Sequence, residues 1–410
     1  MKSLFRNYID TFRGLSKEVW WLALITLINR AGTMVIPFLS LYLTQGLHLS
    51  LKEVGWIMTA YGFGSVVGSW LGGKLTDMFG YYKVMLASML LTGISFVALQ
   101  YLSTFVSFSI GLFIVMIVAD CFRPAMFVAV SSYSKDVNKT RSVTLIRLAI
   151  NLGFSAGPVV GGLIITYLSY SGLFWVDGVT CFLAGLLILL VLNPKKVIEQ
   201  KEVIEIKNPI SPYKDKLFWI FFGAMFLFAI VFLQYFSTVP LYYKEIIMLN
   251  ETEIGLLMGM NGALIFILEM PLVKWVEKKK FNIGYLMFIG AILTGLSIIV
   301  LNASFSISII IIGMLFMTIG EMVAFPFSNT FAMERAKRGN QGAYMAMYSI
   351  SFSVAHIFGH NLGMQMINDY GYQTTWNLMT VLAVLCAFLL FVLTLKMKKE
   401  PAFNSKLISN

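Results

Sequence analysis

Three acidic residues, Asp120, Glu269 and Glu321, stand inside long apolar stretches of the sequence. An ionisable side chain is costly in hydrocarbon, so each of them marks a candidate site for a proton or a ligand. A carboxyl group in a low dielectric with no cation nearby holds its proton near neutral pH, as a proton carrier must. No basic residue lies near Glu321 in the sequence. We therefore expect proton-coupling chemistry at Asp120 and Glu321.

Each of these assignments has a structural alternative. Asp120 precedes Arg123 by three residues, a spacing that puts both side chains on one helix face, where they can form a static ion pair. Glu321 can hydrogen-bond to a neighbouring helix instead of carrying a proton. Glu269 lies near Lys274 and close to the end of its apolar stretch, so this third proton-coupling candidate is expected to act as a gating or interface acid.

Basic and polar residues inside other apolar stretches form the candidate substrate site. Arg30 follows Asn29 directly, and Arg147 stands one helical turn before Asn151. An interior arginine can neutralise an acid or hold an anionic group of a substrate, and it can also simply tie helices together. The predicted substrate-binding set is Asn29, Arg30, Arg123, Arg147, Asn151, Gln234, Tyr235 and Asn261.

Two further polar features are expected to be structural. His356 and His360 are four residues apart, a spacing that can bind a metal, but no third ligand is apparent around them. Polar packing or a proton relay is therefore expected there, and no metal site. Asp177 lies near the outer end of its apolar stretch and is expected to anchor the end of a loop.

Aromatic and methionine side chains are abundant in the apolar stretches. Mixed walls of this kind suit apolar ligands of variable shape, although most such residues in any bundle face lipid or other helices. Aromatic candidates for a cavity wall are Tyr61, Phe63, Tyr235, Phe236, Tyr344 and Tyr348.

The composition of the chain excludes a soluble globular protein. Of its 410 residues, 58% are hydrophobic and only 12% are charged, against about a quarter charged in a soluble domain. A helix needs about 20 apolar residues to cross a membrane, and such stretches recur here. We predict an all-α membrane protein with twelve transmembrane helices, at residues 19–44, 53–77, 83–103, 106–132, 142–168, 172–193, 217–241, 253–275, 282–301, 305–332, 341–367 and 373–396.

The net charge of +11 is a topology signal. With the loops assigned alternately to the two sides of the membrane, 26 of the 31 Lys and Arg residues fall on the side that holds both termini. Short loops rich in Lys and Arg face the cytoplasm. We therefore predict cytoplasmic termini in a multi-pass protein of the cell membrane, and no nucleic-acid partner.

The two halves of the sequence resemble each other at an offset of about 200 residues. Residues 52–58 (KEVGWIM) correspond to residues 252–258 (TEIGLLM), and Asp120 falls against Glu321. Several matches at one offset indicate a duplicated six-span unit, whose substrate site lies at the interface of the halves near mid-bilayer. The predicted architecture is two pseudo-symmetric six-helix bundles, residues 1–193 and 217–410, joined by a cytoplasmic linker at 194–216.

The second predicted span ends in a loop, GKLTDMFGYYK, that contains Gly73, Asp77, Gly80 and Lys83. It resembles the loop signature of the major facilitator superfamily. In that family the glycines allow close helix packing, and the acid interacts with a helix N-terminus or a basic partner and latches the outward-facing state. A carboxylate is favoured at the positive end of a helix. Only Lys83 remains of the family's basic positions, which implies a weaker latch; a simple packing turn is the alternative.

The fifth predicted span contains the sequence GFSAGPVVGG, with Gly153, Gly157, Pro158, Gly161 and Gly162. It resembles a signature of proton-coupled antiporters of the same superfamily. Small residues four apart let two helices approach closely, and the proline bends the span and frees a carbonyl group. An ordinary packing seam explains the glycines but less readily the proline. Over nearly its whole length the chain resembles the twelve-helix drug:proton antiporters.

The resemblance implies a proton-coupled secondary transporter that exports a small amphipathic molecule by alternating access. The proton gradient would drive it, with no cofactor, and it would act in the lipid bilayer as a monomer. The sequence has no nucleotide-binding loop, nucleophile elbow or zinc-protease motif, so an enzyme is not expected.

Two alternatives to drug export stay open. Residues 150–153 (INLG) and 320–321 (GE) resemble motifs of proton-coupled oligopeptide transporters, which implies a peptide or metabolite symporter. Asn29 and Arg30 stand where that family has glutamate. A lipid flippase or a non-transporting receptor would need a lateral opening or a sensing domain.

Overall fold

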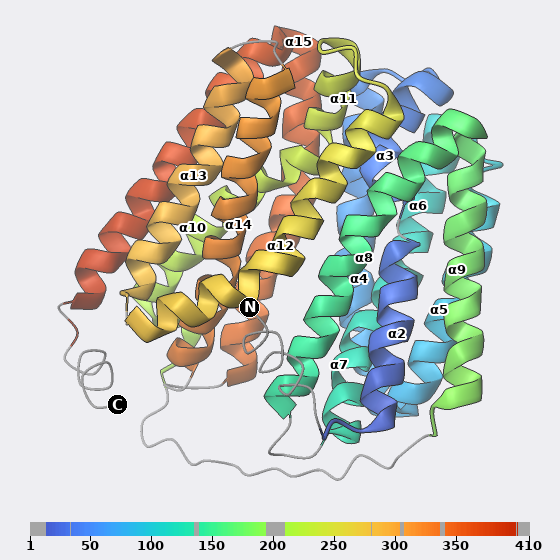
Figure 1. The fold of residues 1–410 in the computed structure, drawn as a ribbon, viewed down its shortest axis with the longest axis horizontal. Helices are drawn as coiled ribbons and strands as arrows, with labels where there is room; N and C mark the ends of the chain where they lie inside the picture. The colour runs from blue at the N-terminus through green and yellow to red at the C-terminus, as the bar shows by residue number, and fades with distance from the viewer. Residues whose placement is uncertain are drawn as a thin grey trace, which may run out of the picture. The chain divides into compact units, whose positions relative to one another are not determined.

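The computed structural model describes residues 14–32, 34–134, 139–193, 210–279, 281–303, 307–336 and 341–398, together with Glu400. All the regular structure within these ranges is helical, as predicted (Figure 1). The two termini lie outside the described residues. So do residues 194–209, which make up most of the predicted linker.

The chain forms two compact units, which are described separately. Unit 1 comprises the described residues within 1–49, 60–201 and 250–266, and unit 2 those within 50–59, 202–249 and 267–410. Helices α4 (Leu51–Phe79) and α12 (Glu251–Lys279) each belong to both units along their length. The division of the chain into bundles of residues 1–193 and 217–410 stays a prediction.

The remaining helices of unit 1 all come from the first half of the chain. They are α2 (Lys17–Ala31), α3 (Val35–Leu41), a π-helical turn η1 (Tyr42–Gly46), α5 (Tyr81–Leu99), α6 (Phe105–Asp120), α7 (Phe122–Tyr133), α8 (Lys139–Tyr167) and α9 (Tyr170–Val191). Helix α5 runs beside α9, and α2 lies beside α8 (Figure 1). A core of apolar side chains such as Leu22, Met85 and Ile188 fills the space between these helices.

The remaining helices of unit 2 come from the second half. They are the short 3-10 turns η3 (Pro212–Lys214) and η4 (Gln234–Phe236), α10 (Lys216–Leu233), α11 (Thr238–Glu245), α13 (Ile283–Ala303), α14 (Ile307–Ala336) and α15 (Gln341–Lys398). Helix α15 packs against both α10 and α13, and α13 packs against α14. The core is rich in aromatic rings, among which Phe221 contacts Phe331 and stacks on Tyr348.

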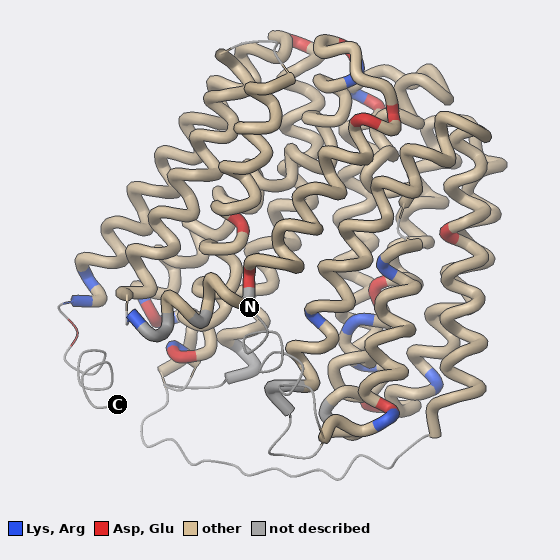
Figure 2. Tube along the Cα trace, in the orientation of Figure 1, with Lys and Arg blue, Asp and Glu red and all other residues tan. Residues whose placement is uncertain are grey.

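Most helices are apolar on all sides, the pattern of helices that face lipid. Helix α6, for example, has Asp120 as its only charged residue, and the exposed fractions of its Ile110 and Ile114 are 57% and 50%. Figure 2 shows long stretches of helix without any Lys, Arg, Asp or Glu. The few charged side chains within these stretches therefore stand out as candidates for function.

Ten helices among the described residues are long and apolar enough to cross a membrane. The sequence predicted twelve spans, and the difference arises at two places. Helix α4 is not among the ten, because its many glycine and polar residues lower its mean hydropathy. Helix α15 counts once although two predicted spans lie within its 58 residues, which are interrupted at Gly371 by a φ of 77°.

Two local features before α4 and α12 recur at the offset of the predicted repeat. Ser50 and Glu53 form a reciprocal cap at the start of α4, with Ser50 N–H donating to Glu53 Oε2 at 2.8 Å and Glu53 N–H to Ser50 Oγ at 3.3 Å. Asn250 and Glu253 do the same for α12 at 2.8 and 2.9 Å. The residues at 48 and 248, His and Met, both adopt a positive φ (54° and 62°). Equal offsets of 200 residues support a duplicated unit.

Candidate functional site

The first predicted span is broken rather than continuous. Helix α2 ends at Ala31, and α3 begins at Val35 with the carboxylate of Asp177 on α9 at its N-terminal end. Met34 N–H donates to both oxygens of Asp177 at 2.9 and 3.1 Å, and Val35 N–H donates to Oδ2 at 3.0 Å. Asp177 has an exposed fraction of 0%. The expectation that Asp177 anchors the end of a loop is therefore wrong: it satisfies backbone donors inside a span, where no water can.

Arg30 lies in the last turn of α2, next to this break. Its guanidinium group sits over the ring of Phe154 on α8, with Cζ 5.6 Å from the ring centroid. Its Nε is buried and has no hydrogen-bond partner among the described residues. A buried donor of a charged group without an acceptor is costly, which makes Arg30 a candidate for binding an anion or another acceptor.

Asp120 faces Arg30 from the end of α6. The Ser65 side chain is its hydrogen-bonding neighbour, and it interacts electrostatically with Arg30 and, less strongly, with Arg123. The phenol of Tyr61 interacts with the same charges. The sequence indicated Arg123 as the partner of Asp120; the structure adds an electrostatic interaction with Arg30, from another helix. We call Arg30, Tyr61, Ser65, Asp120 and Arg123 the charge cluster of unit 1.

A proline places the charge cluster at a helix break. Pro124 lies in the first turn of α7 and has no N–H to donate to the carbonyl of Asp120, four residues earlier. Helix α6 accordingly ends at Asp120, and α7 begins at Phe122. With two guanidinium groups and one carboxylate, the charge cluster carries one more cation than anions.

The other predicted substrate-binding residues of unit 1 lie on α2, α8 and α12. Asn29 is buried, and its Nδ2 donates to Cys181 Sγ at 3.6 Å. Arg147 and Asn151 lie one turn apart on α8, and Asn261 lies on α12; all three are half-buried. Asn29 is thus part of the contact between α2 and α9.

The remaining predicted residues belong to unit 2. Glu321 is half-buried on α14, and Glu269 is buried on α12. Gln234 is fully buried, and its Nε2 donates to the carbonyls of Ile230 and Gly359, both at 2.9 Å. Its Oε1 accepts from Thr238, which leaves the amide occupied in helix packing. Tyr235 is buried beside Ser297.

His356 and His360 contact each other. His356 Nδ1 and His360 Nε2 are 3.3 Å apart on α15. Within the described residues, no group of three or more His, Cys, Asp or Glu residues is arranged to hold a metal ion.

The loop motif between α4 and α5 contains a glycine turn, an exposed acid and a close helix contact. Gly80, with a φ of 83°, precedes α5, a backbone geometry that favours glycine. Asp77 is exposed. The close helix contact is made at Gly72, where a Cβ would lie 2.6 Å from Cys121 Cα, whereas a Cβ on Gly73 would meet nothing within 4 Å.

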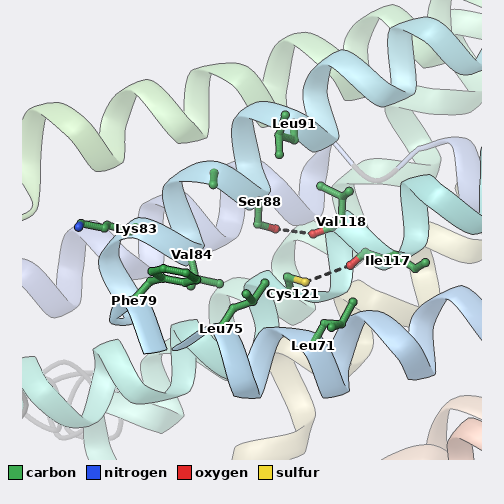
Figure 3. Close-up of a pocket in the computed structure, with 11 residues that line it drawn as sticks. Leu71, Leu75, Phe79, Lys83, Val84, Ser88, Leu91, Ile117, Val118 and Cys121 are labelled. Atoms are coloured by element: carbon green, nitrogen blue, oxygen red, sulfur yellow. Dashed lines mark hydrogen bonds between the residues drawn. The ribbon is translucent and has the colours of Figure 1, made fainter. Parts of the chain in front are cut away.

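Lys83 stands at one end of an apolar groove of about 400 Å³ on unit 1 (Figure 3). The groove lies between α4, α5 and α6, and the Ser88 hydroxyl in its wall donates to Val118 O at 2.7 Å. None of the three acids predicted to couple protons lines it. The charge cluster, not this groove, is therefore the candidate site for proton chemistry.

The glycines of the α8 motif face several helices. A Cβ on Gly161 would lie 3.2 Å from Met34 Cβ on the α3 side, and one on Gly162 would collide with the backbone of Glu251 on α12. Gly157 and Pro158 are buried in the same helix. This seam fixes α8 against α3 and against the first turns of α12.

Gly153→Ala is expected to destabilise the protein. Its Cβ would lie 2.5 Å from Arg30 Cβ and 2.9 Å from Ala31 N, which forces α2 and α8 apart at the charge cluster. Overpacking of this kind costs about 1–3 kcal/mol. A Cβ on Gly73 would meet nothing within 4 Å, so Gly73→Ala in this helix is expected to stabilise the protein by about 0.5–1 kcal/mol. Thermal unfolding in detergent measures both; equal midpoints for the two variants would contradict the tight packing at Gly153.

Comparisons with known proteins agree with this fold. The profile of the Major Facilitator Superfamily matches residues 22–360. The uncharacterised MFS-type transporter YqjV of Bacillus subtilis (strain 168) is 26% identical over 362 residues, which cover 86% of this chain and 87% of YqjV.

Two more relatives cover a similar share of the chain. The Na(+), Li(+), K(+)/H(+) antiporter of Planococcus maritimus is 22% identical over 88% of this chain and 92% of its own length. The multidrug resistance protein MdtH of Aeromonas salmonicida (strain A449) is 22% identical over 86% and 87%. Among solved structures, a POT family transporter in complex with 5-aminolevulinic acid has a TM-score of 0.80 at 16% identity, covering 94% of this chain and 98% of that one. That likeness establishes the fold.

Proposed function

Because this chain belongs to the Major Facilitator Superfamily and is a multi-pass membrane transporter rather than an enzyme, we propose that it is a proton-coupled secondary transporter. It moves a small amphipathic molecule by alternating access, as a multidrug efflux protein does. Its twelve spans form two six-helix bundles in the cell membrane, with both termini in the cytoplasm. The proton gradient drives transport without a cofactor, and the protein works as a monomer.

The observation that carries this proposal is the electrostatic interaction of Asp120 with two arginines of unit 1, Arg30 and Arg123. When Asp120 is ionised, it neutralises part of the charge of Arg30 and Arg123. When it takes up a proton, both guanidinium groups lose their counter-charge. A single proton therefore changes the net charge of the charge cluster by one, which couples proton binding to substrate binding.

The charge of the substrate decides the sign of this coupling. A cationic group is repelled when Asp120 is protonated, so proton and substrate compete and exchange across the membrane. An anionic group is attracted when Asp120 is protonated, so proton and substrate bind together and move together. The names of the antiporter and multidrug relatives support the first mode.

A second candidate function is symport of a peptide-like or other metabolite that carries a carboxylate. It is supported by the excess of cations in the charge cluster and by the buried, unpartnered Nε of Arg30. A guanidinium group pairs readily with a carboxylate.

Transport into proteoliposomes tests the two functions together. The purified protein is reconstituted, a pH gradient is imposed, and uptake of an apolar organic cation, an amphipathic carboxylate and a dipeptide is compared. Efflux by exchange predicts that the cation moves against the direction of proton flow. Symport predicts that the carboxylate or the dipeptide moves with the protons. If no probe responds to the gradient, proton coupling is wrong.

A further inference from the structure

The break in the first span is held by side chains of a single helix face. Asp177, Thr180 and Cys181 lie three and four residues apart on α9, so they share one face. Asp177 binds the backbone at the start of α3, and Cys181 accepts from Asn29 near the end of α2. Thr180 fills the space beside Gly32, where a Cβ would collide with its hydroxyl. One turn of α9 thus contacts the chain on both sides of the break.

The carboxylate of Asp177 is fully used by the backbone. Both of its oxygens accept N–H groups, at distances between 2.9 and 3.1 Å. These bonds are charge-assisted, and no water inside a span can accept a hydrogen bond from these donors instead. The geometry therefore makes this side chain a backbone acceptor that holds the start of α3.

Arg30 depends on the same junction for its position. It is the second-last residue of α2, between Asn29 on one side and the break on the other. On the α8 side Arg30 is fixed by two residues. Gly153 has no Cβ and so leaves space for Arg30 Cβ, and the ring of Phe154 lies under the guanidinium group. A shift of the end of α2 would move its guanidinium group relative to Asp120 in the charge cluster.

We propose that Asp177 is a positioning residue: by holding the break between α2 and α3, it fixes Arg30 in the charge cluster. The part of this proposal that concerns transport rests on the proposed function. The part that concerns the break does not, and the two parts are tested by separate measurements.

The break is tested by the reactivity of Cys181, which needs no transport. In a chain with Cys121→Ala and Cys386→Ala, Cys181 is the single thiol, and it is buried. Asp177→Asn keeps the shape but turns an amide NH₂ toward an N–H donor. We expect Cys181 to react with a membrane-permeant maleimide on the order of tenfold faster, because losing a buried charge-assisted bond favours local opening. Asp369→Asn, at an exposed carboxylate, is the matched control and should leave the rate unchanged.

The action through Arg30 is tested by a double-mutant cycle. We expect Asp177→Asn to lower the transport rate on the order of tenfold in the natural chain, but less than twofold when Arg30→Lys is already present, because the two effects share one cause. A merely structural role of Asp177 would reduce transport by the same factor in both backgrounds, and that result would overturn the proposal.

A second variant keeps the test usable if Asp177→Asn does not fold. Gly32→Ala disturbs the same junction without removing a charge, because its Cβ collides with Thr180. It is expected to speed the reaction of Cys181 as well, while Gly73→Ala is not. If the Cys181 rate stays unchanged in Asp177→Asn and in Gly32→Ala, α9 does not hold the break. If the rate rises but the natural chain shows no pH-driven transport, the proposed function fails and the role of Asp177 at the break stands.

Discussion

Asp120→Asn is expected to reduce transport driven by a pH gradient to the level of protein-free liposomes, while exchange of substrate at equal pH continues. Asparagine has nearly the shape of aspartate but cannot take up a proton, so Arg30 and Arg123 lose their counter-charge permanently. The charge cluster then stays in the state that a proton would produce, and the gradient no longer changes it. The measurement is the initial rate of uptake under an imposed gradient, compared with counterflow without one.

Two other carboxylates give this experiment a control and a second test. Asp369→Asn removes an exposed carboxylate that pairs with Lys52 Nζ at 2.8 Å, and it should leave both activities unchanged. Glu321→Gln removes the proton site predicted in unit 2, and it should also abolish the response to the gradient while exchange continues. If Asp120→Asn keeps its full pH dependence and Glu321→Gln loses it, the proton site lies on α14, and Asp120 is a static partner of Arg30.

The helices could be predicted from the sequence because a membrane restricts the backbone conformations of a segment that crosses it. An apolar stretch of spanning length must satisfy its backbone internally, and a helix does so. The predicted boundary between the last two spans, at residues 367–373, contains the Gly371 break of α15. The correspondence of residues 52–58 with 252–258 includes Glu53 and Glu253, which cap α4 and α12 in the same way because a helix N-terminus needs an acceptor for its N–H groups.

The break in the first span could not be predicted in the same way. Residues 19–44 form one stretch of spanning length, and neither Gly32 nor Pro37 shows by itself that α2 ends at Ala31 and α3 begins at Val35. What stabilises the break is Asp177, more than 140 residues later, and hydrophobic periodicity carries no information about such a partner. That an interior arginine can neutralise an acid was expected, but no spacing along the sequence showed that Arg30 would interact with Asp120.

Arg335 lies between two predicted spans, 305–332 and 341–367, and yet it is buried. Arg335, in the last turn of α14, and Asp215, which caps α10, are each only 3% exposed. Arg335 donates from Nε to Asp215 Oδ2 at 2.6 Å and from Nη2 to Oδ1 at 2.7 Å, and its Nη1 reaches Glu400 at 2.6 Å. Tyr344 donates to Asp215 Oδ2 at 2.9 Å. This network joins the ends of α10, α14 and α15 in unit 2.

Arg335→Met is expected to cause the largest loss of stability among the variants considered. It leaves the carboxylate of Asp215 buried without its counter-charge, and breaking a buried pair in this way costs about 3–5 kcal/mol. The cap of α10 survives, since Asp215 Oδ1 still accepts from Leu217 and Phe218 N–H at 3.1 and 3.2 Å. The free energy of unfolding at pH 7, from denaturation by dodecyl sulfate in mixed micelles, measures the loss.

The pH dependence of this loss distinguishes an ion pair from simple packing. Burial alone would raise the pKa of Asp215, but the hydrogen bonds and charge of Arg335, with the bond from Tyr344, outweigh it and hold the pKa below its usual range. Stabilisation by a carboxylate with a lowered pKa is present above the unfolded-state pKa, about 3.9, and is lost as the pH falls through the folded-state pKa. The difference in unfolding free energy between the natural chain and Arg335→Met should therefore shrink below about pH 4.

Asp369→Asn, at an exposed pair, should leave the unfolding free energy nearly unchanged at every pH. A loss for Arg335→Met that is no larger than this control, or that is the same at pH 7 and below pH 4, would mean that Arg335 contributes only its packing.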